Sequence, residues 1–120
     1  MKKMTLAVVG SLFVAAGSAA HAADLAAGKA AFEKFTCATC HGADGKTSTL
    51  PSYPVLAGQH ADYLAHALRA YKRGQAGEPA SANVRKNAIM GAMVQQLSDT
   101  DIENITAWLA SLPSPLSVSK

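Results

Sequence analysis

Aromatic residues, charged residues and cysteines are all scarce in this 120-residue chain. Aromatic residues make up 6% and charged residues 16% of it, against 49% hydrophobic residues, and there are two cysteines. The low charge and ordinary apolar content exclude a disordered chain, and the length predicts one small domain. A domain of this size buries about two thirds of its unfolded surface, so a core with few rings is thin unless another group fills it.

The first 22 residues have the pattern of a secretory signal peptide. Lys2 and Lys3 form a positive start, residues 6–16 an apolar run, and Ala20-His21-Ala22 a cleavage site with small residues at both ends. The alternative is a retained membrane anchor, because no charged residue interrupts residues 4–23. We expect cleavage after residue 22 and export to the periplasm.

Cleavage changes the charge of the chain. The net charge of the full sequence is +3, and loss of Lys2 and Lys3 leaves nine basic against eight acidic residues. The domain that remains, residues 23–120, is nearly neutral and gives no reason to expect a nucleic-acid partner. We expect this domain to be monomeric and free of the membrane.

Hydrophobic periodicity predicts an all-α domain. Three stretches repeat apolar residues at helical spacing: residues 25–35, 61–73 and 99–112. Asp24 and Ser98 are suited to be the N-caps of the first and third helices, and Gly74 to be the C-cap of the second. Turn-forming glycines and prolines predict two long loops, residues 42–59 and 74–90, and loops of that length in a small domain usually enclose something.

Both cysteines lie in one pentapeptide, Cys37-Ala38-Thr39-Cys40-His41. This is the spacing of a c-type haem-attachment site. Two thiols three positions apart can each add to one haem vinyl group, and the adjacent histidine can then bind the iron as an axial ligand. A haem attached in this way is a covalent part of the core and compensates for the missing aromatic rings.

Two alternatives remain for the cysteine pair. One is a thioredoxin-like dithiol, but that motif belongs at the start of a helix in a strand-rich fold. The other is a zinc site shared with His60 and His66, but the gap between Cys40 and His60 exceeds the usual spacing. In addition, six residues along a helix leave the two imidazoles about 120° apart around its axis.

A haem that only carries electrons needs a second axial ligand. After the signal segment, the chemically suitable residues are Met90, Met93, His60 and His66. The two histidines have the pattern of partly exposed helix residues. The spacing of the two methionines does not by itself decide between them.

The order of these motifs resembles a class I c-type cytochrome, and more narrowly the small bacterial periplasmic branch that includes single halves of the dihaem c-four type. The resemblance covers residues 23–120. It rests on the haem motif, on the segment PVLAGQ at residues 54–59, and on Met90 seven residues before Leu97 of an LSD triplet. It implies a cytochrome c-like fold, with three main helices and long loops around one covalently attached haem.

The resemblance also assigns the haem-binding residues. Cys37 and Cys40 would hold the single haem c covalently, and His41 and Met90 would be its axial ligands, with Met93 a neighbour. Two axial ligands leave no open position on the iron for a substrate, so the protein is expected not to be an enzyme. The methionine thioether and an apolar pocket predict a positive midpoint potential.

Further positions follow from the resemblance. His41 would donate its other ring proton to the carbonyl of Pro54, over an interval one residue longer than the family pattern. Gly28 and Phe32 would let the first helix cross the last one closely, against Trp108, and the connection from Phe32 to the first cysteine is also one residue longer. Three residues lie where the family contacts the haem propionates or pocket: Tyr53, Arg85 and Lys86.

Together these features predict a periplasmic electron carrier. It would shuttle electrons between a membrane quinol-oxidising complex or a dehydrogenase and a terminal oxidase or reductase. One alternative is a haem subunit fixed on a larger redox enzyme as its electron-entry point. Another is a ligand-binding or peroxidase-like haem enzyme, in which Met90 would have to be absent from the iron or labile.

Overall fold

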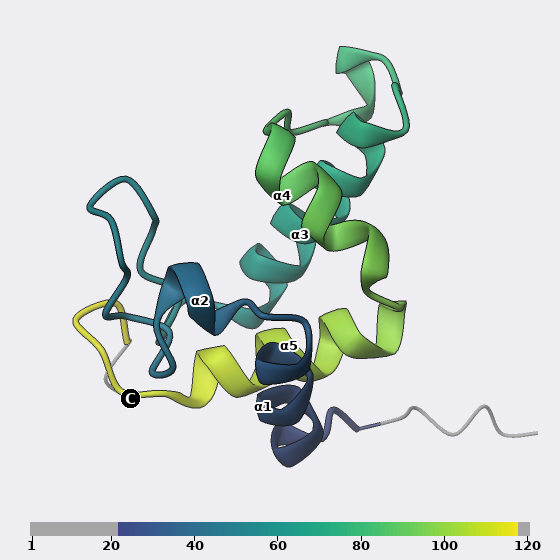
Figure 1. Ribbon diagram of the computed structural model, residues 1–120. Helices are drawn as coiled ribbons and strands as arrows, with labels where there is room; N and C mark the ends of the chain where they lie inside the picture. Colours follow the sequence, from purple (N-terminus) through teal and green to yellow (C-terminus); the bar gives the residue numbers. More distant parts are fainter. Residues whose placement is uncertain (1–21, 118–120) are drawn as a thin grey trace, which may run out of the picture.

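The computed structural model describes residues 22–117, and every regular element in that range is helical (Figure 1). The elements in chain order are α1 (Leu25–Lys34), α2 (Ala38–His41), α3 (Ala61–Gln75), the 3₁₀ turn η1 (Ala80–Ala82), α4 (Ala88–Met93), the 3₁₀ turn η2 (Val94–Gln96) and α5 (Asp99–Ser111). Positions 1–21 of the signal segment expected from the sequence lie outside the described residues. Among the helices described, none combines the length and the apolar character needed to cross a membrane.

The three main helices expected from the sequence are α1, α3 and α5, and two of their predicted caps are confirmed. The Asp24 carboxylate accepts the backbone N–H of Ala27 at 3.0 Å. Ser98 and Asp101 form a capping box: the Ser98 hydroxyl accepts the Asp101 N–H at 3.0 Å, and the Asp101 carboxylate accepts the Ser98 N–H at 2.9 Å. These bonds explain why α1 and α5 begin where they do.

The predicted C-cap at Gly74 is wrong. The helix α3 continues to Gln75, and the glycine with a left-handed backbone is Gly77, with φ of +77°. Gly74 lies inside the helix, where the carbonyl of Arg85 packs so closely on its Cα that no side chain would fit. The close approach of this later segment, and not the end of the helix, accounts for the glycine.

The second predicted loop is therefore too long at both ends. Residues 74 and 75 belong to α3, and the last three residues belong to α4, which begins at Ala88. Six residues are too few for a hydrophobic repeat to stand out in the sequence. The first predicted loop, residues 42–59, is free of helix and strand in the structure.

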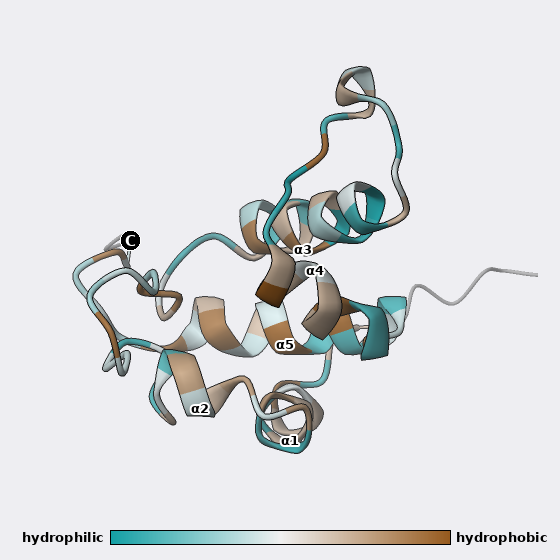
Figure 2. Cartoon of the chain, turned by 45° about the horizontal axis from the view of Figure 1, so that its top comes forward, coloured by the Kyte–Doolittle hydropathy of each residue, from teal (hydrophilic) through white to brown (hydrophobic). Residues whose placement is uncertain are grey.

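The helices α1 and α5 cross in close contact, as expected. Figure 2 looks down the axis of α1 while α5 runs across the view. Gly28 packs against the backbone carbonyl of Asn104 and the Cβ of Trp108, which a side chain at Gly28 would prevent. One turn further on, the ring of Phe32 lies 5.1 Å from that of Trp108, tilted by 53°. This crossing is the centre of the core.

The other helices complete the core around α5. In Figure 2, α3 and α4 lie above α5, and α1 and α2 lie below it. Arg69 of α3 reaches Asp99 at 3.4 Å and Glu103 at 3.6 Å on α5. The buried apolar cluster is formed by Ala31, Phe32, Leu64, Ala65, Val94, Leu97, Ile102, Ile105, Trp108 and Leu109.

Replacement of Gly28 by alanine is expected to destabilise the protein, although alanine is the better helix former by about 1 kcal/mol. The added methyl group would overlap the Asn104 carbonyl, and separating α1 from α5 is expected to cost about 2 kcal/mol net. Chemical unfolding followed by circular dichroism measures the loss. Ala30→Gly, on the exposed side of α1, is the control and should cost about 1 kcal/mol through propensity alone. A Gly28→Ala protein as stable as the parent would contradict the crossing.

Candidate functional site

The turn between α1 and α2 orients the cysteine motif. The N–H of Cys37 donates to the carbonyl of Phe32 at 3.1 Å, and the N–H of Thr36 donates to that of Glu33 at 3.0 Å. This pair of bonds is a Schellman motif, in which the residue at the Thr36 position has a left-handed backbone and is usually glycine. Thr36 adopts φ of +60° there, so a β-branched residue occupies a strained position next to the first cysteine.

The motif itself forms one helical turn. The N–H of His41 donates to the carbonyl of Cys37 at 3.0 Å, and Gly42, with φ of +80°, ends the turn. Cys37 and Cys40 are free thiols, both half-buried. Three positions apart on a helical turn, they lie on the same side of it.

Burial raises the pKa of the Cys37 thiol. A redox-active dithiol needs the opposite, because the thiolate is the reactive form and its pKa is lowered in thioredoxin-like motifs. Cys37 therefore lacks the electrostatic setting of a reactive cysteine in a catalytic disulfide.

His41 is buried, with 7% of its surface exposed, and one of its ring nitrogens is already engaged. Its Nδ1 donates to the carbonyl of Pro54 at 3.3 Å, which confirms the hydrogen bond expected from the resemblance. Burial lowers the pKa of His41, and the bond to Pro54 opposes this more weakly. The imidazole is thus neutral near pH 7, with its proton on Nδ1 and the lone pair of Nε2 free to bind a metal.

The loop of residues 42–59 holds Pro54 in place through backbone hydrogen bonds. The N–H groups of Leu56 and Ala57 both donate to the carbonyl of Gly45, at 2.8 and 3.0 Å. The N–H of Gly58 then donates to the carbonyl of Leu109 in α5 at 2.8 Å. The longer interval before Pro54 is accommodated within this loop, and the histidine's partner is anchored to the central helix.

Tyr53 lies beside the same histidine. Its ring centroid is 6.1 Å from that of His41, and the rings are tilted by 50°. Arg85 instead lies over the rings of Tyr63 and Tyr71 on α3, at 5.5 and 5.8 Å. Tyr53 is thus next to the predicted axial ligand, and Arg85 is engaged with α3.

The two methionines belong to the short helix α4. Both are half-buried, and Met90 packs against the buried apolar cluster. The side chain of Asn87 caps α4 and accepts the N–H groups of Ile89 at 3.0 Å and of Met90 at 2.9 Å. Asn87 was not singled out in the sequence, although an asparagine three residues before Met90 is a helix-start signal.

The histidines outside the motif have no such setting. His60 precedes α3 and His66 lies on it, and both are exposed. Over residues 22–117 no three histidine, cysteine, aspartate or glutamate side chains are grouped as a metal site requires. The zinc alternative therefore has no ligand set in the described part of the chain.

The residues around the motif fit a haem. The donor atoms are those that a c-type haem uses: two thiols, an imidazole nitrogen and a thioether sulfur. Other apolar side chains pack on the core while staying partly exposed, a setting that suits the walls of a site for a large flat apolar group. They come from α2, the 42–59 loop and α3: Ala38, Leu56, Leu68 and Tyr71.

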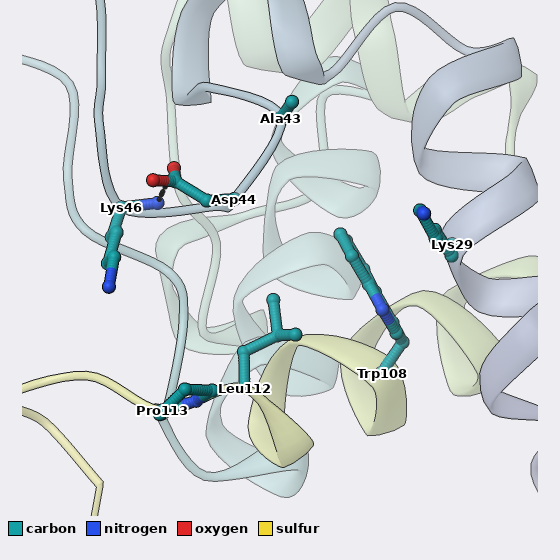
Figure 3. Close-up of a pocket in the computed structure, with 7 residues that line it drawn as sticks. All are labelled: Lys29, Ala43, Asp44, Lys46, Trp108, Leu112 and Pro113. Atoms are coloured by element: carbon teal, nitrogen blue, oxygen red, sulfur yellow. Dashed lines mark hydrogen bonds between the residues drawn. The ribbon is translucent and has the colours of Figure 1, made fainter.

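A surface hollow of about 290 Å³ lies elsewhere, beside Trp108 of α5 and Leu112 just after it (Figure 3). Its acidic group, Asp44, accepts the N–H groups of Lys46 at 2.9 Å and Thr47 at 2.8 Å. Hydrogen bonds from Thr47 above all lower the pKa of Asp44 to about 2. The carboxylate of Asp44 is therefore engaged in the hydrogen bonds of its own turn. None of the predicted haem residues lines this hollow.

The fold and the site define a helical domain built to carry a covalently attached haem. The family model described as "Cytochrome c" matches residues 25–113, so the chain belongs to the cytochrome c family. Membership confirms the cytochrome c fold and is consistent with a class I c-type cytochrome. It also means that the protein transfers electrons through haem c, and it makes the thioredoxin-like interpretation wrong.

Several relatives show which members of the cytochrome c family this chain is similar to. Cytochrome c-554(548) of Halomonas halodenitrificans is 43% identical over 79 residues, which are 63% of this chain and 83% of that protein. Cytochrome c4 of Stutzerimonas stutzeri is 40% identical over 75 residues, 62% of this chain and 35% of that protein. A crystal structure of reduced recombinant cytochrome c4 from Pseudomonas stutzeri matches with a TM-score of 0.65 and 39% identity, over 77% of this chain and 47% of that one.

Lengths differ among these relatives. The chain spans most of cytochrome c-554(548) but less than half of the cytochrome c4 chains that it matches. A third relative, named "Thiosulfate dehydrogenase electron acceptor" in Stutzerimonas stutzeri, is 34% identical over 66% of this chain and 32% of that protein. The chain thus resembles one portion of these longer proteins.

Thr36→Gly is expected to stabilise the protein by about 1 kcal/mol, because glycine adopts the left-handed backbone without the clash of a Cβ. The measurement is the midpoint of guanidinium unfolding. Thr36→Ala is the control: it keeps a Cβ in the left-handed region and should gain much less. If the glycine variant were the less stable of the two, Thr36 would not be strained.

Proposed function

We propose that this protein is a periplasmic electron carrier with one haem c, attached through Cys37 and Cys40 and ligated by His41 and Met90. The observation that carries the proposal is the setting of His41. Its ring is buried, its Nδ1 donates to the Pro54 carbonyl at 3.3 Å, and two half-buried thiols lie on the same helical turn.

The bond to Pro54 gives His41 its chemical role. Because Nδ1 carries the proton, Nε2 keeps its lone pair, and the carbonyl increases the basicity of the ring. Because burial lowers the pKa of His41, the ring needs no deprotonation before it binds iron near neutral pH. Tyr53 and the 42–59 loop restrict the orientation of the ring.

Met90 is the proposed second ligand because it packs on the core cluster and is held at the start of α4 by Asn87. Ligation by both side chains leaves no coordination position for oxygen, peroxide or an organic substrate. The haem supplies a one-electron couple when bound. A thioether ligand in apolar surroundings favours the reduced state, so we expect a positive midpoint potential.

The proposed partners are redox proteins. One relative is named as the electron acceptor of a thiosulfate dehydrogenase, which supports a dehydrogenase as one class of electron donor. The acceptor would be a terminal oxidase or reductase. Carriers of this kind use small, short-lived interfaces. The alternative, a haem subunit fixed on a larger enzyme, predicts a stable large complex in size-exclusion chromatography, whereas a free carrier elutes as a monomer.

The Met90→Ala protein is expected to lose the ferric absorption band near the red end of the visible spectrum that methionine ligation produces, whereas Met93→Ala should keep it. Met93 is the matched control, since it lies on the same helix and is also half-buried. The measurement is a ferric spectrum, with a pyridine haemochrome to count the haem in each variant. Loss of the band in Met93→Ala alone would make the ligand assignment wrong.

The domain boundary has a separate test. Export of the full chain is expected to remove residues 1–22 and leave Ala23 as the first residue. Intact mass spectrometry of the periplasmic protein measures this end together with the covalent haem. An uncleaved chain recovered with the membrane fraction would support the anchor alternative instead.

A further inference from the structure

The segment between α3 and α4, residues 76–87, is tied back onto α3 by arginine side chains. Arg73 of α3 donates from Nε to the carbonyl of Ala82 at 2.9 Å and from its terminal nitrogen to that of Asn83 at 2.8 Å. These bonds satisfy carbonyls at the end of η1. They hold the part of the segment around residues 82 and 83 against α3.

Arg85 makes the opposite connection: it belongs to the 76–87 segment, and its side chain reaches back to α3. Its guanidinium donates to the hydroxyl of Tyr63 at 3.0 Å, and it lies over the rings of Tyr63 and Tyr71. Its backbone N–H donates to the carbonyl of Ala70 at 3.0 Å, and its carbonyl packs on the bare Cα of Gly74. Both the main chain and the side chain of Arg85 are therefore fixed to α3.

This attachment is only a few residues from the proposed iron ligand. Two residues after Arg85, the side chain of Asn87 accepts the N–H of Met90 at 2.9 Å. Beyond it, Gly91 is buried and lies against the side-chain amide of Gln75 at the end of α3. The start of α4 is thus set by Arg85, and its middle contacts the end of α3.

We propose that Arg85, held by Tyr63 and Tyr71, is a positioning residue for Met90 and controls how readily an external ligand replaces its thioether on the iron. The proposal rests on Met90 being the axial ligand. Arg85 contacts neither Met90 nor its sulfur in the interactions described. It acts by fixing where the chain leaves α3 and enters α4.

The expected effect follows from competition. An added imidazole binds the iron through its nitrogen lone pair while the bond to the Met90 sulfur breaks, and no electron is transferred. Its apparent affinity rises as the state with Met90 in place loses free energy relative to the open one. Removal of the Arg85 guanidinium eliminates its exposed cation–π contacts and its hydrogen bond to Tyr63. This loss should raise the apparent affinity for imidazole about tenfold.

The experiment compares ferric Arg85→Ala, Arg85→Lys and Arg69→Ala by imidazole titration, followed through the methionine band. Arg69 is the matched control, because it is an arginine of α3 whose side chain reaches α5 and not the 76–87 segment. We expect tighter imidazole binding in Arg85→Ala, an intermediate value in Arg85→Lys, and the parent value in Arg69→Ala. Hydrogen exchange should accelerate at the Met90 and Gly91 amides in Arg85→Ala only.

The outcomes separate this proposal from the ligand assignment. If the band persists in Met90→Ala, the ligand assignment fails, whatever Arg85 does. If the band depends on Met90 but imidazole binds Arg85→Ala and the parent protein equally, the positioning role is overturned. Equal tightening in Arg69→Ala would also overturn it, since general loss of stability would then be the cause. A shift in midpoint potential with unchanged imidazole affinity would show that Arg85 acts on the haem electrostatically, which contradicts positioning.

Discussion

The close crossing of α1 over α5 is the constraint on which the rest of the structure depends. Because Gly28 has no side chain, the backbone of α1 reaches the carbonyl of Asn104, and Phe32 can pack on Trp108. The same Phe32 offers its carbonyl to the N–H of Cys37, so the residue that anchors α1 in the core also fixes the start of the cysteine motif. The position of the motif relative to α5 is thus set by contacts within the chain.

Pro54, the hydrogen-bond partner of His41, is also anchored to α5, through the loop that follows the cysteine motif. The 42–59 loop closes on itself at Gly45 and then joins α5 through the bond from Gly58 to Leu109. His41 and Pro54 are therefore both held in position relative to α5. A loop of this length would otherwise leave a single 3.3 Å bond too weakly constrained to hold one ring orientation.

Those parts of the fold that local signals specify could be predicted from the sequence. Asp24 and Ser98 cap helices through their own side chains, and the spacing of the cysteines and His41 carries its chemistry in five residues. The incorrect prediction at Gly74 came from a contact distant in sequence: the glycine has the pattern of a helix end but is a packing site for Arg85. Thr36 was not singled out in the sequence, because a threonine gives no sign that its position has the left-handed backbone usually given to glycine. Cys37, Cys40 and His41 were proposed from the motif and Met90 from the resemblance, whereas the contacts that Asn87 and Arg85 make before Met90 required the fold.

The two proposed axial ligands are supported by very different parts of the molecule. His41 is buried, and its hydrogen bond is anchored through two connections to the central helix. Met90 lies on a six-residue helix whose cap, Asn87, and whose anchor, Arg85, are both exposed to solvent. Segments held by exposed bonds open at lower free energy than those held by the core. With His41 and Met90 as ligands, exchange should therefore take place on the methionine side, and the proposed covalent attachment and His41 would keep the haem in the protein.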